Sequence, residues 1–390
     1  MKRRAIVTVI TRNYLHFALA LAESVAEHQP DCDFYICMAD QPPAGWSPMA
    51  GPAKVFYASE LPIDNWRRFA FQYTPFELSC ALKPFAMKHL TSRDYEEVVY
   101  LDSDMRLYQP LAEVFAALDQ YSIVLTPHLL RPFPVDNGRP GEELFLMAGT
   151  YNAGFLAVRN DSIATDFLNW WQQKLEKHGH KDLAGSFFVD QKWLSLATGL
   201  FSRVFTLRNP AYNTGHWTLP QFPLGSDSCG RLTIDGKSIV LFHFSNLSPS
   251  NRNEFLNCQN RLTFEDVPQL ARMVDEYHAA VARYNTNGFA NWGCAWDTLE
   301  DGTAIHPAWR EAIRRDEPLF ADLEDPFAIP GNSPIVAKLT AMQGRARKWR
   351  RDWRLKGTQT TGPEVVSQSK KLKGQLKSFL SKVGLRRKAA

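Results

Sequence analysis

A pair of carboxylates stands directly after a short apolar run. Asp102 and Asp104 are separated by one serine and follow residues 97–101, EVVYL, which have the composition of a buried strand. Two like charges this close are costly unless a cation joins them. Divalent cations that prefer oxygen ligands bind such carboxylates and commonly bridge them to ligand phosphates. The pattern predicts a metal–diphosphate site, and the alternative is an ordinary acidic turn at a strand end.

Three further motifs carry polar groups suited to the same chemistry. Asn152 and Gly154 lie in a strand pattern at 151–158, where a glycine often marks close approach of backbone or ligand. Asp190 and Gln191 open a helical pattern, and Asp190 alone is a plausible N-cap. His243 ends an apolar run, and alone it is typical of a buried core histidine.

An alternating α/β fold is expected to position these motifs. A β-branched run at 5–10 is followed by helical spacing to about residue 28 and by a strand at 33–38, an opening typical of a parallel sheet. Further strands are predicted at 55–57, 97–101, 122–126, 151–158, 204–207 and 238–244. Helices are predicted at 76–90, with Pro84 as a kink or new start, and at 111–118, 162–177, 189–197 and 267–284. Such sheets bind ligands at the carboxyl ends of their strands.

In this order of motifs the sequence resembles the GT-A glycosyltransferases, particularly glycosyltransferase family eight, which includes glycogenin and bacterial lipopolysaccharide glycosyltransferases. The resemblance runs from about Ala5 to Leu247 and does not extend past about Arg252. It implies an α/β fold of the GT-A (Rossmann-like) kind, with a mixed, mostly parallel sheet flanked by helices. The expected segments are a nucleotide-sugar-binding catalytic domain at 1–255, a helical or irregular region at 256–330, and a basic tail at 331–390.

The resemblance also implies a role for each motif. The donor-binding residues it implies, from the nucleobase through the phosphates to the sugar, are Thr8, Asn13, Tyr14, Lys83, Asp102, Ser103, Asn152, Ala153 and Gly154. Asp190 and Gln191 are implied as catalytic residues beside the anomeric carbon of the donor sugar. Asp102, Asp104 and His243 are implied as the metal ligands, with Mn²⁺ the preferred ion and Mg²⁺ the alternative.

The activity implied by the resemblance is transfer of a sugar from a nucleoside-diphosphate sugar, with UDP expected, to an acceptor hydroxyl in surface glycan or lipopolysaccharide synthesis. Retention of the anomeric configuration is also implied. No lone carboxylate stands out as a nucleophile, which favours a front-face, ion-pair path over a covalent intermediate. In one departure, the family follows its metal-binding histidine with a lysine that binds diphosphate. Here SNLSPSNR follows Phe244, which leaves Arg252 as the candidate substitute.

Two other classes of function are considered beside this one. A sugar nucleotidyltransferase also uses a nucleotide-binding α/β domain with metal-binding carboxylates. It would normally carry a glycine-rich loop after its first strand, and residues 11–16, TRNYLH, contain no glycine. A non-catalytic, membrane-associated scaffold is the other class, and its carboxylates should tolerate replacement.

Charge is distributed unevenly along the chain. Residues 331–390 hold 16 Lys and Arg against 2 Asp and Glu, a net charge of +14, whereas the remainder holds 29 against 39, a net charge of −10. Cations mixed with Trp349, Trp353, Phe379 and Leu380 suit an interfacial helix on an anionic membrane surface, and a disordered, solvated tail is the equal alternative. Nothing in the acidic body indicates a nucleic-acid partner. The partners expected are the nucleotide-sugar donor and a glycan or lipid-linked acceptor.

The N-terminus and the cysteines bear on the compartment. The run after MKRR is interrupted by Thr8 and ended by Arg12, so it is read as a strand and not as a signal peptide. No window has the roughly 18 apolar residues that a membrane-spanning helix needs. Six cysteines in 390 residues, without a CxxC pair, favour reduced thiols over a disulfide framework. A cytoplasmic protein is expected, either free or peripheral on the inner face of the membrane.

Overall fold

The structure is a computed structural model that describes residues 2–43, 45–46, 51, 53–248, 251–315 and 323–341. Met1–Val336 form one compact unit and Ala337–Ala390 a second. The segments predicted at 1–255 and 256–330 both lie within the first unit. The predicted basic tail extends beyond residue 341, outside the described residues. Within the described part of the chain, no helix is both long enough and apolar enough to cross a membrane.

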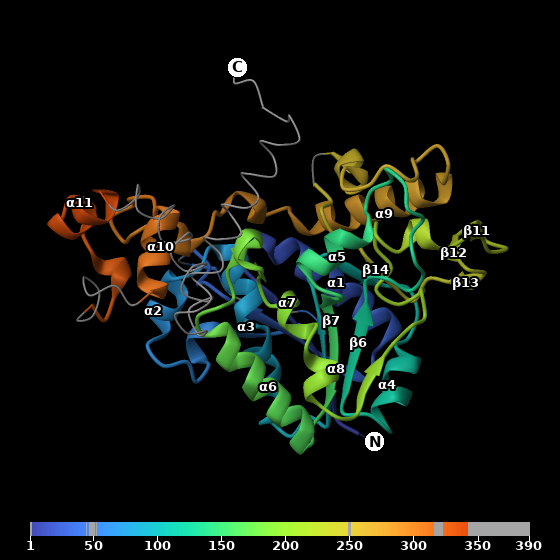
Figure 1. The fold of residues 1–390 in the computed structure, drawn as a ribbon, viewed down its shortest axis with the longest axis horizontal. Helices are drawn as coiled ribbons and strands as arrows, with labels where there is room; N and C mark the ends of the chain where they lie inside the picture. Colours follow the sequence, from blue (N-terminus) through green and yellow to red (C-terminus); the bar gives the residue numbers. More distant parts are fainter. Residues whose placement is uncertain are drawn as a thin grey trace, which may run out of the picture. The chain divides into compact units, whose positions relative to one another are not determined.

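A seven-stranded sheet forms the centre of the first unit (Figure 1). In spatial order its strands are β10 (Val204–Thr206), β6 (Ile123–Pro127), β7 (Tyr151–Arg159), β4 (Glu97–Leu101), β1 (Arg4–Ile10), β2 (Cys32–Met38) and β3 (Ala53–Tyr57). Neighbouring strands pair in parallel except at β7, which is antiparallel to both β4 and β6. This order confirms the predicted mixed, mostly parallel α/β fold.

Two long helices connect the strands that flank the centre of the sheet. α1 (Leu15–His28) joins β1 to β2, and α3 (Pro75–Thr91) lies on the path from β3 back to β4. The chain moves in opposite directions along the sheet in these two crossovers, so right-handed connections place α1 and α3 on opposite faces. α9 (Pro268–Tyr284) packs beside α1, and α6 (Ser162–Leu175) packs beside α3 (Figure 1). The strand order therefore reverses between β1 and β4, and α/β sheets bind ligands at the crevice formed there.

Helix α3 begins at a well-formed cap. The Thr74 hydroxyl accepts a hydrogen bond from the Glu77 N–H (3.3 Å), and the Glu77 carboxylate accepts one from the Thr74 N–H (2.9 Å). Pro75 occupies the first turn, where no N–H is needed. The helix continues through Pro84 to Thr91, whereas a kink or a new start was expected at Pro84. One uninterrupted helix thus carries Lys83 to the crevice.

The remaining elements are short. They are α2 (Trp66–Phe71), β5 (Met105–Leu107), α4 (Ala112–Leu118), α5 (Glu142–Ala148), β8 (Lys181–Asp182), β9 (Phe187–Phe188), α7 (Gln191–Leu194), α8 (Ala197–Leu200), β11 (Leu224–Ser226), β12 (Leu232–Ile234), β13 (Lys237–Ser238), β14 (Leu241–His243), α10 (Pro307–Arg314) and α11 (Pro334–Ala341). The helix predicted at 189–197 is divided into α7 and α8. The strand predicted at 238–244 is divided into β13 and β14, which belong to different sheets.

The region after residue 256 is tied to the first half of the chain by two arginines of α10. Arg310 on α10 is 3% exposed, and its guanidinium donates hydrogen bonds to the carbonyl oxygens of Phe71 (3.0 Å) and Tyr73. Arg314 donates to the carbonyl oxygen of Gln72 (2.5 Å). These carbonyls follow the end of α2, where the helix leaves its acceptors without internal partners. The C-terminal helices are therefore part of the unit that forms the crevice.

Candidate active site

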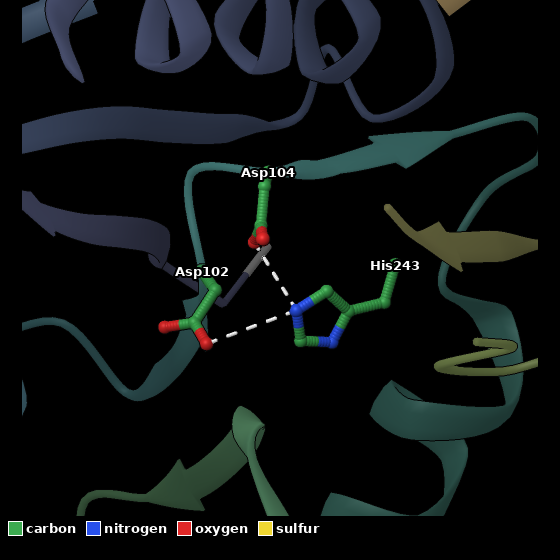
Figure 2. A group of neighbouring side chains, drawn as sticks. All are labelled: Asp102, Asp104 and His243. Carbon is green, nitrogen blue, oxygen red and sulfur yellow. Dashed lines mark ion pairs between the residues drawn. The ribbon is translucent and has the colours of Figure 1, made fainter. Parts of the chain in front are cut away.

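Asp102, Asp104 and His243 converge at the end of β4 (Figure 2). His243 Nε2 lies 3.1 Å from Asp104 Oδ1 and 3.9 Å from Asp102 Oδ2. One potential ligand atom from each residue lies within 4.8 Å of the others. The two carboxylates are partly exposed, at 29% for Asp102 and 28% for Asp104, whereas the imidazole is buried. The triad predicted from the sequence is thus assembled with its open side toward solvent-accessible space.

A two-stranded ribbon brings the histidine to the carboxylates. β5 begins immediately after Asp104 and pairs antiparallel with β14, so that Met105 stands opposite His243. The Phe244 N–H donates a hydrogen bond to the Asp104 carbonyl oxygen (2.8 Å), and the His243 N–H donates one to the Thr214 carbonyl oxygen (2.8 Å). Backbone pairing therefore fixes the separation between the Asp-x-Asp turn and His243, about 140 residues later in the sequence.

An asparagine orients the imidazole. His243 Nδ1 lies 3.1 Å from Asn213 Oδ1, so in the neutral ring Nδ1–H donates to this oxygen and the Nε2 lone pair faces the carboxylates. Two carboxylates and an imidazole held in this tautomer form a donor set that fits a divalent transition metal. Without an ion, burial lowers the pKa of His243, but attraction to Asp104 outweighs burial and leaves that pKa raised. Burial likewise opposes the effect of His243 on Asp104, whose pKa is lowered on balance.

Gly154 on β7 lies against the triad where no side chain fits. A Cβ at this position would stand 2.5 Å from His243 Cε1 and 2.8 Å from Asp102 Oδ2. Real Cβ atoms do not come so close, and both contacted groups belong to the triad. The glycine predicted to mark a close approach therefore allows strand β7 to pass directly beside the candidate metal ligands.

Lys83 forms a second, more deeply buried polar cluster beside the triad. Its Nζ lies 3.0 Å from Asp102 Oδ1 and 3.1 Å from Asp190 Oδ2, and it donates a hydrogen bond to the Ala153 carbonyl oxygen (3.0 Å). Burial lowers the pKa of Lys83, but the two carboxylates outweigh it and raise that pKa well above its ordinary value. Burial raises the pKa of Asp190, against the opposing effect of Lys83. A single ammonium group thus lies between two carboxylates that face it from different elements.

Asp190 is not an N-cap in the sense considered from the sequence. Asp190 directly precedes α7. Its side chain accepts no capping hydrogen bond, and its backbone dihedral angles are helical. Its carboxylate faces Lys83 instead. The neighbouring Gln191 is held by the backbone: its Oε1 accepts from the Ala153 N–H (3.2 Å) and its Nε2 donates to the Ala148 carbonyl oxygen (3.2 Å).

Buried amides connect this cluster with the triad. Asn152 Oδ1 accepts hydrogen bonds from the Gly154 N–H (2.9 Å) and from Asn213 Nδ2 (3.0 Å). Asn213 in turn faces His243 through its Oδ1. The strand motif at 152–154 is therefore joined to the triad through Asn213, a residue that the sequence analysis did not identify. Asn213 adopts a positive φ of 52°, which asparagine tolerates better than most residues, but this gave no signal readable from its neighbours.

A pocket of about 500 Å³ opens at the crevice between the ends of β1 and β4. Its walls come from the residues after β1, the first turns of α3, the Asp-x-Asp turn and a loop near residue 295. The lining residues are Val9, Ile10, Thr11, Asn13, Tyr14, Thr74, Pro75, Phe76, Ser79, Cys80, Lys83, Tyr100, Asp102, Ser103, Asp104, Gly293, Cys294 and Asp297. Most of the residues predicted to bind the phosphates and the nucleobase therefore line one concave surface, the usual form of a ligand site.

Not every predicted donor-binding residue lines this pocket. Thr8 is fully buried in β1, and the residues at 152–154, with Asp190 and Gln191, lie outside the lining. Ala153 and Asp190 nevertheless contact Lys83, which does line it. The residues at 152–154, with Asp190 and Gln191, therefore lie on the side of the triad that faces β7 and not on the side that faces the pocket.

Two further residues clarify the electrostatics of the site. The Tyr100 hydroxyl donates a hydrogen bond to Asp102 Oδ1 (2.7 Å). Residues two apart along a strand point to the same face, so this orientation could have been predicted from the sequence.

Arg252, the candidate substitute for the missing lysine, pairs with Asp275 on α9 at 2.5 Å and does not line the pocket. The structure thus offers no support for Arg252 as a diphosphate ligand.

Comparisons with known proteins found distant similarities in sequence and in structure. No protein-family model matches it. It is 24% identical over 298 residues to the uncharacterized protein YfnF of Bacillus subtilis (strain 168), covering 74% of this chain and 97% of YfnF. Among solved structures it is similar to the apo form of the glycosyltransferase GlyE of Streptococcus pneumoniae TIGR4, with a TM-score of 0.42, 14% identity, and coverage of 74% of this chain but 64% of GlyE. It is also similar to the galactosyltransferase LgtC in complex with donor and acceptor sugar analogues, with a TM-score of 0.40, 15% identity, and coverage of 72% and 95%.

Proposed function

We propose that the protein is a metal-dependent glycosyltransferase that moves a sugar from a nucleoside-diphosphate sugar, with UDP as the nucleotide, to an acceptor hydroxyl. The observation that carries this proposal is the Asp102–Asp104–His243 triad beside a 500 Å³ pocket at the point where the strand order reverses. Ligands of open α/β sheets bind at such a point. The two carboxylates face the pocket, and the imidazole behind them completes a donor set for Mn²⁺ or Mg²⁺.

Residues on opposite sides of the triad bind different parts of the donor. A divalent ion held by the three side chains supplies positive charge to the departing diphosphate. Tyr14 and Asn13 line the pocket on the β1 side, where an exposed tyrosine ring and an amide suit a nucleobase. Asp190 and Gln191 lie on the β7 side, where they would border the sugar.

The environment of Asp190 bears on the stereochemical path. Its side chain is 1% exposed and paired with Lys83, and burial raises its pKa. A nucleophilic carboxylate has to be free to reach the anomeric carbon, whereas the Asp190 carboxylate is held by the Lys83 ammonium group. We therefore propose a retaining transfer through a front-face ion pair, in which Gln191 is oriented by its backbone hydrogen bonds beside the reacting centre. Determination of the product's anomeric configuration tests this path, and an inverted product would overturn it.

The acceptor is proposed from charge and not from geometry. The net charge of +14 at 331–390 suits an anionic membrane surface, where a glycan or lipid-linked acceptor would be met. Flotation with anionic and neutral liposomes, using the full chain and a form ending at residue 341, tests this part. Equal flotation of both forms would remove the tail from the account.

The proposed activity is tested by turnover of a panel of UDP-sugars. Purified protein is incubated with each UDP-sugar and Mn²⁺, and released UDP is measured with and without EDTA. We expect metal-dependent release with at least one sugar, and loss of at least about a hundredfold in Asp104→Asn, because a ligand to the ion is removed. Asp166→Asn, an exposed carboxylate on α6, is the matched control. Turnover that survives both EDTA and Asp104→Asn would contradict the proposal.

A further inference from the structure

The loop at residues 292–297 forms one wall of the pocket, although it lies beyond the motifs that carry the sequence resemblance. Gly293, Cys294 and Asp297 all line the pocket. The loop is attached to the end of β2: the Trp296 indole N–H donates to the Ala39 carbonyl oxygen (2.7 Å), and the Ala295 N–H donates to Asp40 Oδ2 (2.9 Å). This wall is therefore built against the same sheet edge that carries the triad.

Arg12 and Asp40 fix the loop from the ends of β1 and β2. Arg12 donates hydrogen bonds to the carbonyl oxygens of Gly293 (3.1 Å) and Trp292 (3.1 Å). The Arg12 N–H itself donates to Asp40 Oδ1 (2.7 Å), and Asp40 is 2% exposed. Two carbonyl groups of the loop are thus held by the Arg12 guanidinium, and the Arg12 backbone is bonded to the buried Asp40, so the loop occupies a defined position in the wall.

Arg310 sets the loop beside the start of α3. Its guanidinium donates to the Trp296 carbonyl oxygen (2.5 Å) and to that of Tyr73, the residue immediately before the α3 cap. Asp297 therefore lies near the pocket residues at 74–76. Phe76, which is 56% exposed, presents an aromatic side chain to this end of the pocket. A carboxylate and an exposed ring at one end of a pocket suit a flat heterocycle that carries hydrogen-bond donors.

The separation of this end from the triad fits the length of a nucleotide. The triad follows β4, whereas the loop is bonded at the end of β2, two strands away in the sheet. Two strand spacings amount to roughly 10 Å. Along α3, Phe76 precedes Lys83 by seven residues, which is also about 10 Å of helix. A diphosphate at the triad would thus place its ribose across the pocket and its nucleobase against the loop.

The carboxylate of Asp297 is available to such a base. Arg310 Nη2 lies 4.0 Å from Asp297 Oδ1, too far for a hydrogen bond, and the side chain is 56% exposed. It accepts no hydrogen bond from the residues that the structure describes. Its oxygens can therefore accept from a ligand without breaking a hydrogen bond to the residues that the structure describes.

We propose that Asp297 is a specificity-determining residue that selects a nucleobase presenting a ring N–H, the class to which uracil, thymine and guanine belong. The carboxylate accepts this N–H in a charge-assisted hydrogen bond. Cytosine and adenine present a ring-nitrogen lone pair at the corresponding edge, which the carboxylate repels. This inference rests on the proposed function, because it takes the pocket as the site of a nucleoside diphosphate.

The test compares UDP with CDP by calorimetry in the presence of Mn²⁺, in the full chain and in Asp297→Asn. We expect the full chain to bind UDP at least tenfold more tightly than CDP, and the variant to lose about that preference, because its amide both donates and accepts. Asp166→Asn serves as the matched control and should keep the preference. In the full chain, N3-methyl-UDP should bind at least tenfold more weakly than UDP, a measurement that needs no folded variant.

The outcomes separate this inference from the proposed function. Metal-dependent UDP binding with an unchanged preference in Asp297→Asn, or with full affinity for N3-methyl-UDP, would overturn the role of Asp297 and leave the proposed function standing. Failure of the full chain to bind UDP, CDP, GDP or ADP with Mn²⁺ would overturn both.

Discussion

The carboxylate of Asp190 and the carboxylate pair of Asp102 and Asp104 lie close together in this site but differ in exposure and in the cation that each faces. Asp190 is 1% exposed and faces the buried ammonium of Lys83 at 3.1 Å. Asp102 and Asp104 are more than a quarter exposed, and Asp104 is paired with a histidine whose charge depends on pH. Lys83 also reaches Asp102, so it joins the two groups. The chain thus supplies a permanent cation on the β7 side and leaves the pocket side to a titratable ring.

The difference indicates where an external cation is needed. Buried charges have to be paired within the protein, and Lys83 does this for Asp190. A triad of two carboxylates and one imidazole has a net negative charge whenever the ring is neutral, and a divalent ion neutralises that charge. The Lys83–Asp190 pair balances its own charge and is suited to keep the neighbouring groups in place. The triad has an excess of negative charge and is suited to bind a metal ion together with an anionic ligand.

The largest effect is expected on folding, when the cation of the Lys83–Asp190 pair is removed. Lys83→Met removes the cation and leaves Asp190 buried without a partner, which should lower the free energy of unfolding by about 3–5 kcal/mol. Urea unfolding followed by circular dichroism measures this loss. Lys83→Met combined with Asp190→Asn should recover a large part of it. If Lys83→Met alone unfolds like the unmodified chain, the ion pair has no structural role.

A smaller effect, on metal affinity, is expected at Gly154. The Cβ of Gly154→Ala would overlap His243 and Asp102, so the triad has to shift. We expect Mn²⁺ affinity to fall by about 10–100-fold, as for other changes that displace metal ligands. Titration of Mn²⁺ followed by electron paramagnetic resonance measures it. Gly199→Ala on α8, where a Cβ meets open space, is the matched control and should bind Mn²⁺ unchanged. Equal affinities in the two variants would contradict this role for Gly154.

Removal of the group that orients the imidazole should have a still smaller effect. Asn213→Ala leaves the ring in place but removes the acceptor for Nδ1–H, and we expect Mn²⁺ affinity to fall by about tenfold. Asn213→Asp keeps an acceptor and should retain more affinity than Asn213→Ala. An alanine variant with full metal affinity would show that the tautomer is set by other groups.

The last effect expected is a dependence on pH, of opposite sign with and without metal. The raised pKa of His243 means that its pairing with Asp104 contributes stability fully present below pH 6.5 and lost as pH rises through the folded pKa. Metal needs the neutral ring, so its affinity should fall by up to about tenfold per pH unit below that pKa. The increase in melting temperature produced by Mn²⁺ should therefore grow as pH rises from 6 to 8. An increase that shrinks over this range would exclude His243 as a ligand.

Sequence patterns predicted those parts of the fold that depend on local order. The strand at 97–101 and its Asp-x-Asp turn were correctly placed because a buried strand ending in two carboxylates is a continuous signal. The helix at 189–197 was wrong in extent, since the chain divides into α7 and α8 after Leu194. Asp190 was open to an N-cap interpretation because sequence spacing does not reveal Lys83, a partner more than a hundred residues away.

Contacts between distant segments account for the rest of the site. His243 was selected only through resemblance, and the ribbon of β5 and β14 shows why it meets Asp104. Asn213 and the loop at 292–297 were not identified, because neither carries a motif and both acquire their positions from tertiary hydrogen bonds. The membrane prediction rests on the basic tail at 331–390, of which residues 342–390 lie outside the described residues, and it stays a prediction.

The central claim is that the triad binds a nucleoside diphosphate through a metal ion. It is tested most directly by calorimetry of UDP binding to the full chain, with Mn²⁺ and with EDTA. We expect binding with Mn²⁺ and a loss of at least about a hundredfold in affinity with EDTA. Equal affinity in the two conditions would contradict the account, because the uncompensated carboxylates at the pocket would then have no part in holding the diphosphate.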